Sequence, residues 1–412
     1  MKMKHISGNR YIRKQGNIVY FDNIEVEKIL KFSKTPLLIF LEARIRDNIR
    51  TFKSAAERIF KDPSIFYSFK ANYLYDICKI IKSEGIGAEI VSLPELDLAI
   101  SLGYPPNKII AGGPYLDNKF IEQCIINNIE EIVVYTIKDI ERINEIAKNH
   151  NKIQNLCLRI NSQKYDTRLG TKLLGHELNQ IRLYQKKCTN IQFRTILSHY
   201  STQMNSVNQF TKNAEILIKA FNKLYNSDVE IKNINFGGGF PEAAIMPKSQ
   251  LELILSRLYK ILYDEGIEYE KIYFEPGRFL VGDAGIFIAE IVNKTEDRWI
   301  FLNIGNNICP KFSRSSFRFY NASKIDHPHK YKTSIAGIIP TDQDVLAKNY
   351  FFNDDIEIGD KVLITNVGAY TLTFSNRFPY ELPSILLVNG LKTSKIFDPK
   401  RDHDFSLKPF PS

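Results

Sequence analysis

The sequence contains no run of about eighteen consecutive apolar residues, so we expect no membrane-spanning helix. The N-terminal stretch MKMKHISGNRYIRKQGN is basic, but no apolar segment follows it, and we therefore expect no secretory signal. Low-complexity segments and repeats of a fixed period are also absent. These absences favour a cytoplasmic protein.

Cysteine pairs and basic blocks are also missing. Five cysteines are scattered over 412 residues without a C-x-x-C pair, which argues against a disulfide framework or a zinc site. We expect no metal centre. The net charge of +10 comes from lysines spread among many asparagines and isoleucines, without a dense basic block. A compositional bias explains this charge, so we expect no nucleic-acid partner.

What the chain does contain is enough apolar sequence for a large core, since 44% of its residues are hydrophobic. Short β-rich runs alternate with helical patterns, which predicts parallel strands joined by crossover helices. The runs lie at 36–42, 64–69, 88–92, 108–113, 130–136, 155–161, 193–200, 231–239 and 271–277. About eight such units fit a TIM-type (β/α)8 barrel, and we place this domain at residues 36–285.

After residue 285 the strand-like runs follow one another without helices between them. The segment at 9–23 also resembles a strand and hairpin, and it could pair with these later strands. We therefore predict a second, β-rich domain built from residues 1–35 and 286–412.

Several polar residues directly follow predicted barrel strands. They would lie at the rim of the barrel where TIM-barrel enzymes have their active sites. Lys70 ends the run FYSFK, and shelter by its aromatic neighbours could lower its pKa and free the amine for a Schiff base. A solvated lysine is the alternative. His199, the glycine run at 237–239 and the pair Glu275 and Arg278 follow three other strands. Each alone suits a structural histidine, a tight turn or a surface ion pair, but together they indicate an active site.

Short stretches in order resemble the fold-type III pyridoxal-phosphate (PLP) decarboxylases, which include the diaminopimelate, ornithine and arginine decarboxylases. YSFKAN resembles the family's Y-A-x-K-A/C-N, and GAEIVSLPEL resembles its G-x-D-x-x-S-x-x-E-L. LRIN, HYSTQ, GGGFP, EPGRFLVGDAG and GAYT follow in the family's order, so the matches extend from residue 66 to residue 371. The resemblance implies an alanine racemase-like fold, a PLP cofactor and a homodimer with shared active sites.

The resemblance also implies roles for individual residues. Lys70 would hold PLP as a Schiff base, His199 would stack on its ring, and Glu275 would pair with the protonated ring nitrogen. Glu95 and Arg159 would support the site. The phosphate would be bound by the backbone or hydroxyl groups of Gly237, Gly238, Gly239, Gly277, Arg278 and Tyr370.

The substrate-facing motifs depart from the family. Its G-P-x-C-E/D-x-x-D, whose cysteine lies across a dimer interface and helps direct reprotonation, reads GIIPTDQD here. Pro340 and Thr341 replace the cysteine and the acid, so a tyrosine or water supplies the proton, or the substrate differs. Asp344 is kept, and we expect it to meet a substrate amino group. The R-P-x-L-Y stretch is not recognisable, and Arg314 and Arg318 are the substrate-binding candidates in that region.

We therefore predict a PLP-dependent amino-acid decarboxylase of specialised biosynthesis, such as polyamine, siderophore or peptide-antibiotic synthesis. Its substrate would be an unusual amino acid or an amino-acid group on a larger molecule. The alternatives are a diaminopimelate decarboxylase of lysine synthesis, a racemase, and an inactive regulator resembling antizyme inhibitors. Glu275 argues against a racemase, which usually has arginine at the ring nitrogen, and retention of Lys70 and Tyr370 argues against the regulator.

Overall fold

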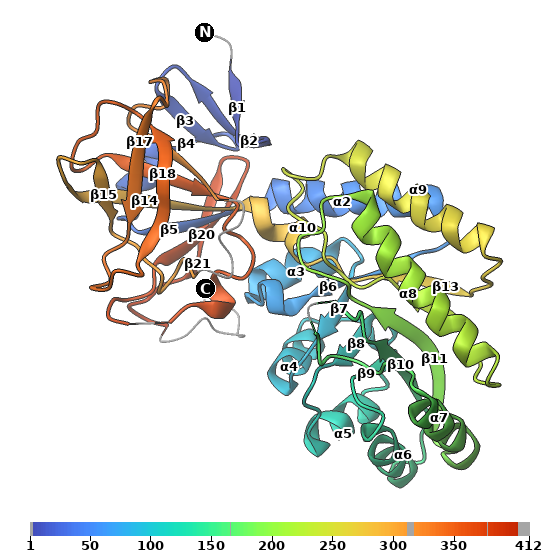
Figure 1. Ribbon diagram of the computed structural model, residues 1–412. Coiled ribbons are helices and arrows are strands. Elements are labelled where there is room, and N and C mark those ends of the chain that lie inside the picture. Colours follow the sequence, from blue (N-terminus) through green and yellow to red (C-terminus); the bar gives the residue numbers. More distant parts are fainter. Residues whose placement is uncertain (1–2, 165, 311–316, 377, 403–412) are drawn as a thin grey trace.

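The structure is a computed structural model, and it describes residues 3–164, 166–310, 317–376 and 378–402. Figure 1 shows a barrel surrounded by helices next to a body made mainly of strands. None of the helices in the described ranges is long and apolar enough to cross a membrane.

Eight parallel strands close into a barrel, because the last strand of the series, β13, pairs with the first, β6. This confirms the predicted TIM-type fold. The strands are β6 (Ser64–Ser68), β7 (Gly87–Ile90), β8 (Ile109–Gly112), β9 (Glu131–Val134), β10 (Gln154–Ile160), β11 (Ile191–Ser198), β12 (Asn233–Asn235) and β13 (Lys271–Phe274).

Helices that precede, connect or follow these strands lie on the outside of the barrel (Figure 1). They are α2 (Glu42–Ile59), α3 (Tyr75–Ser83), α4 (Leu93–Ser101), α5 (Asn118–Ile126), α6 (Asp139–Asn149), α7 (Gly175–Lys187), α8 (Val207–Tyr225), α9 (Lys248–Asp264) and the short α10 (Arg278–Val281). In α2, apolar residues at helical spacing form the buried face, and Phe52 packs edge-on against Phe240 at 4.9 Å between ring centroids.

The second body is a nine-stranded sheet. Its strands are β5 (Leu37–Leu41), β14 (Gly285–Lys294), β15 (Trp299–Leu302), β16 (Arg318–Asn321), β17 (Tyr331–Ala336), β18 (Val345–Phe352), β19 (Lys361–Thr365), β20 (Ser384–Asn389) and β21 (Lys392–Phe397). This confirms the β-rich character predicted after residue 285.

The first of the expected barrel strands lies in this sheet instead. β5 pairs antiparallel with β14 and parallel with β20, so the prediction that residues 36–42 open the barrel is wrong. All five residues of β5 are buried, and a fully buried strand has the same continuous apolar pattern in a barrel and in the middle of a mixed sheet. The division of the chain at residues 36 and 285 stays a proposal.

The N-terminal residues form a sheet of their own. β1 (Lys4–Ile6), β2 (Asn9–Gln15), β3 (Ile18–Phe21) and β4 (Ile24–Glu25) are followed by α1 (Val26–Phe32). The predicted hairpin is confirmed by the antiparallel pairing of β2 with β3. It stacks on the nine-stranded sheet rather than pairing with it, since Ile12 and Phe21 share a buried apolar cluster with Ile39 and Ile286.

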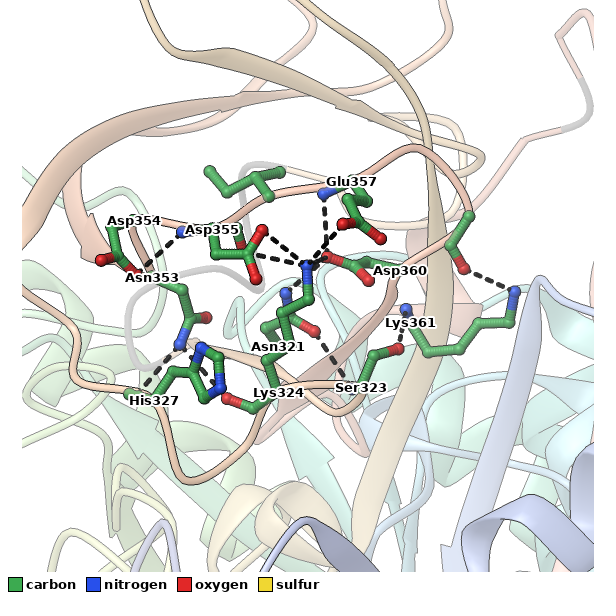
Figure 2. A network of polar contacts seen from close by, with 12 residues as sticks. Asn321, Ser323, Lys324, His327, Asn353, Asp354, Asp355, Glu357, Asp360 and Lys361 are labelled. Atoms are coloured by element: carbon green, nitrogen blue, oxygen red, sulfur yellow. Dashed lines mark hydrogen bonds and ion pairs between the residues drawn. The ribbon is translucent and has the colours of Figure 1, made fainter.

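A polar network ties two loops of the β-rich body together (Figure 2). Lys324 Nζ lies 3.0 Å from Asp355 Oδ1, 3.6 Å from Glu357 Oε1 and 3.5 Å from Asp360 Oδ2. The Asn353 amide donates to the carbonyls of Lys324 and His327. The largely buried ammonium of Lys324 therefore holds the loop after β16 against the loop between β18 and β19.

A buried acid lies inside the barrel, near the ends where the strands begin. Glu131, at the start of β9, is 1% exposed, and its Oε1 contacts the Thr195 hydroxyl and accepts from Asn233 Nδ2. Its Oε2 has no hydrogen-bond partner among the described residues. Burial raises the pKa of Glu131 to about 8, although the Thr195 and Asn233 hydrogen bonds oppose the shift. The folded protein therefore holds Glu131 protonated at neutral pH.

We expect Glu131→Gln to remove a pH dependence of stability. Because the pKa of Glu131 is higher in the folded protein than in the unfolded one, folding keeps a proton on Glu131 between pH 4.5, its ordinary pKa, and about pH 8, and stability falls as pH rises through that window. At about pH 8.5 the free energy of unfolding, measured by urea denaturation, should be higher for the variant than for the parent by on the order of 2–4 kcal/mol. At about pH 5 the two proteins should differ little. An unchanged pH slope in the Gln variant would contradict this, and Glu145→Gln on the exposed face of α6 is the matched control.

Candidate active site

The candidate site lies at the rim of the barrel where its parallel strands end. Lys70 sits in a single 3-10 turn (Phe69–Ala71) directly after β6. The turn is held by buried contacts on both sides: Tyr67 Oη donates to the Asn72 carbonyl at 2.9 Å, and the Phe69 ring packs edge-on against Tyr104. The backbone that carries Lys70 is therefore fixed, while its side chain remains 42% exposed.

Lys70 has a carboxylate partner that sequence reasoning missed. Its Nζ contacts Oε2 of Glu89, which is a buried residue of β7. Burial lowers the pKa of Lys70, but Glu89, acting together with Tyr135, Tyr370 and Glu275, more than offsets this, and the net pKa lies above its ordinary value. The prediction that shelter by the aromatic neighbours lowers the pKa of Lys70 is therefore wrong. The sequence did contain a sign of this partner: Glu89 stands where the family motif G-x-D-x-x-S-x-x-E-L has aspartate, on the strand next to β6.

Glu275 follows β13 and is also buried, at 7% exposed. Its Oε1 accepts from Asn235 Nδ2 at 2.8 Å, and Asn235 Oδ1 in turn accepts from the Gly237 N–H at 2.8 Å. Burial raises the pKa of Glu275 to about 7, Glu89 adds to the shift, and Lys70 and Asn235 oppose it. A buried acid of this kind suits a cationic ring nitrogen, which would favour its charged form. Asn235 is a second supporting residue that the sequence did not reveal.

His199 and the glycine turn lie against each other at the ends of β11 and β12. A Cβ on Gly237 would lie 3.5 Å from His199 Nδ1 and 2.8 Å from the Ser198 carbonyl. The left-handed φ of Gly237 (+65°) adds to the requirement for glycine. Burial lowers the pKa of His199 to about 3, and the cations of Arg159 and Lys70 act in the same direction. The imidazole is therefore neutral, as suits packing on an aromatic ring.

Backbone donors for an anion are present at the same rim. We find no acceptor among the described residues for the N–H groups of Gly238, Gly239 and Gly277. A Cβ on Gly277 would lie 3.5 Å from the hydroxyl of Tyr370, so this tyrosine of the β-rich body reaches the turn after β13. The Tyr370 N–H donates to the Ala71 carbonyl at 2.8 Å, which anchors it beside Lys70. These groups fit a phosphate.

The Arg278 side chain supports this arrangement rather than pointing to an anion. Its Nη1 lies 3.2 Å from Oε1 of Glu242, and both side chains are buried. Its guanidinium lies 4.8 Å from the centroid of the Tyr370 ring. Any contribution of Arg278 to phosphate binding would therefore come from its backbone, as predicted from the resemblance.

Two further residues that we expected to support the site lie in the first turn of α4 (Glu95) and near the end of β10 (Arg159). Glu95 Oε2 accepts from the Val91 N–H at 2.7 Å, and burial raises the pKa of Glu95 to about 7. Arg159 Nη1 donates to Tyr135 Oη at 2.5 Å, and its guanidinium lies 4.4 Å from that ring centroid. Their side chains hold turns and neighbouring rings, which agrees with a supporting role.

Among the described residues, we find no contact between Lys70 and the substrate-binding candidates Asp344 and Arg318. Asp344 is 2% exposed, and its two carboxylate oxygens accept from the N–H groups of Asn306 (2.6 Å) and Ile339 (2.7 Å). These bonds favour a role in holding the loop at 337–344, and a contact with substrate stays a prediction. Arg318 begins β16 and is exposed. Arg314 lies outside the described residues.

These groups fit the parts of PLP. Buried Glu275 suits the ring nitrogen, neutral His199 suits the ring face, the glycine turns suit the phosphate, and Lys70 suits the aldehyde. Residues 42–282 match the family model described as "Pyridoxal-dependent decarboxylase, pyridoxal binding domain". That match covers more than half of the chain.

Full-length relatives agree with this match. The diaminopimelate decarboxylase of Methanocaldococcus jannaschii is 25% identical over 90% of each chain, and that of Aquifex aeolicus is 23% identical over 97% of each. The L-glutamyl-[BtrI acyl-carrier protein] decarboxylase of Niallia circulans is 23% identical over 86% of this chain and 88% of that protein. The crystal structure of the M. jannaschii diaminopimelate decarboxylase with L-lysine superposes with a TM-score of 0.85 at 22% identity, covering 94% of this chain and 95% of that one.

Proposed function

The chain belongs to the pyridoxal-dependent decarboxylases, and from that premise we propose that its substrate is diaminopimelate. It is a PLP-dependent carboxy-lyase acting on an amino acid. The observation that supports catalysis most directly is Lys70 held against Glu89, at the same rim as buried Glu275. The diaminopimelate assignment is supported by two full-length relatives with that activity.

PLP supplies an electron sink for the pair released when CO₂ leaves the α-carbon. We assign the other tasks to this chain's residues. The amine of Lys70 would hold PLP through its aldehyde carbon after losing a proton, and Glu89 pairs with the Lys70 ammonium in the free protein. Glu275 would accept a hydrogen bond from the ring N–H and so favour the protonated ring. His199 would pack on the ring, and the N–H groups of the glycine turns would bind the phosphate.

Specialised biosynthesis, our main prediction from the sequence, is less well supported than its alternative of diaminopimelate decarboxylation. It is kept as a second candidate because Pro340 and Thr341 occupy the positions of the cysteine and the acid in the family motif G-P-x-C-E/D-x-x-D. One relative acts on a glutamyl group carried by an acyl-carrier protein, as its name states. A carrier-bound amino acid is therefore the specific rival substrate.

We also propose a homodimer with shared active sites. Residues 340–343 are exposed, next to the buried Asp344, in the segment that the resemblance places across a dimer interface. A partner subunit would cover this surface and could complete the substrate pocket. A monomer measured by light scattering of the active holoenzyme would overturn this proposal.

We expect CO₂ release from meso-diaminopimelate at a kcat/KM at least about a hundredfold above that for L-lysine, L-ornithine or L-arginine. The measurement is mass spectrometry of each substrate with purified holoenzyme, and heat-inactivated holoenzyme gives the background. Release from a glutamyl-carrier conjugate, without release from diaminopimelate, would contradict the proposal and support the rival. Inversion of the α-carbon without CO₂ would instead indicate a racemase.

A further inference from the structure

One buried polar side chain, that of Asn213 on α8, lies against the strand ends that carry the candidate site. Asn213 is the only polar residue among the buried positions of α8, which otherwise packs on the barrel through apolar side chains such as Phe210 and Leu217. Asn213 is 1% exposed. Burying an amide is unfavourable unless its hydrogen bonds are made, so its partners indicate what the residue does.

Those partners are two backbone carbonyls at the ends of neighbouring strands. Asn213 Nδ2 donates to the Ser198 carbonyl at 3.2 Å and to the Phe236 carbonyl at 3.0 Å. The ladder between β11 and β12 ends one step earlier, where Leu197 pairs with Asn235. Ser198 and Phe236 are the next residues in that register. The Asn213 amide therefore bridges the two chains just beyond their last paired residues.

The residues that follow these carbonyls are the ones that fit the cofactor. His199 follows Ser198, and Gly237 follows Phe236. The Ser198 carbonyl bonded by Asn213 is also the atom that a Cβ on Gly237 would approach to 2.8 Å. The position of this carbonyl thus sets how closely the glycine turn approaches His199. A shift of either strand end would change the distance between the ring-packing histidine and the phosphate-binding turn.

We propose that Asn213 is a positioning residue that couples His199 to the glycine turn at 237–239, and through them sets the affinity for PLP and the environment of its ring. This inference rests on the binding of PLP in this site and not on the identity of the substrate. The residue touches neither the cofactor nor the substrate. It acts by holding two carbonyls at a fixed separation.

The test uses Asn213→Leu, which keeps a similar volume but removes both donors. The matched control is Leu217→Ala, one helical turn further along α8, which creates a cavity and removes no hydrogen-bond donor to either carbonyl. For each protein we would measure the dissociation constant for PLP added to the apoenzyme, the circular dichroism of bound PLP, and the melting temperature of the apoenzyme.

We expect Asn213→Leu to weaken PLP binding by about tenfold and to change the circular dichroism of bound PLP. Leu217→Ala should lower the melting temperature at least as much, yet leave the PLP dissociation constant within about twofold. Should Asn213→Leu not fold, Asn213→Ser takes its place. The same direction of change is expected for Ser, since one short hydroxyl cannot bridge both carbonyls.

Unchanged affinity and dichroism in the folded Asn213 variant would overturn the inference. So would a loss of affinity in both variants that follows the loss of melting temperature, because that result describes general destabilisation. Failure of the parent protein to bind PLP would overturn the cofactor site itself, whereas decarboxylation of a different amino acid would leave the role of Asn213 intact.

Discussion

Lys70→Ala is expected to lower kcat by more than about a thousandfold and to abolish covalent attachment of PLP. Alanine has no amine, and we propose no other group at the barrel rim that would bind the aldehyde. The change should leave the fold intact, because the Lys70 side chain is 42% exposed and its turn is held by Tyr67 and Phe69.

The measurement combines steady-state CO₂ release with the visible absorption spectrum of the purified variant. Lys271→Ala is the matched control, since Lys271 begins β13 at the opposite end of the barrel and pairs with Glu130 at 3.5 Å. The control should keep the yellow colour and the parent kcat. A Lys70→Ala protein with more than about a tenth of the parent activity would remove Lys70 from the mechanism.

Glu275→Gln has the second largest expected effect: kcat should fall by about a hundredfold or more, with a smaller change in KM. The amide occupies about the same volume, and its oxygen can still accept the hydrogen bond that Asn235 Nδ2 donates to Glu275 Oε1 at 2.8 Å. An amide carries no negative charge, however, and cannot hold the ring nitrogen protonated. The ring then accepts electrons less readily when CO₂ leaves.

Glu275→Asp is the informative partner variant, because it keeps the charge and shortens the side chain by one methylene. We expect it to retain more activity than the Gln variant although it fits less well. The two variants are compared by kcat, KM and the pH dependence of the cofactor spectrum. A Gln variant as active as the parent, or an Asp variant as impaired as the Gln one, would show that charge at this position does not matter.

The barrel, and the placement of Lys70, His199 and Glu275 at its rim, could be predicted from the sequence because strand ends are local signals. Alternating β-rich runs and helices place eight parallel strands, and Lys70, His199 and Glu275 each follow one of them directly. The strand β5 could not be assigned in this way. Its five residues are all buried, and burial alone does not say which strands it pairs with.

The contacts of Glu89 and Asn213 could not be predicted, because residues that are distant in the sequence make them. Glu89 lies within a strand and Asn213 on a helix, and no sequence motif identifies the partner of either. Their contacts depend on how neighbouring strands align in register, which the local pattern leaves open. Asp344 shows the converse: an acid kept in a motif is bonded to two backbone N–H groups in the structure. The direction of the Lys70 pKa shift differs from the prediction for the same reason, since the pairing of β6 with β7 brings Glu89 next to Lys70.

The proposed function depends on the Lys70 amine as the group that binds PLP. Borohydride reduction of the purified holoenzyme, followed by proteolysis and mass spectrometry of the peptides, tests this assignment. We expect a phosphopyridoxyl group on Lys70 and on no other lysine, and we expect it to be lost in the Lys70→Ala variant. A label on another lysine, or a reduced holoenzyme with PLP released and no labelled peptide, would contradict it.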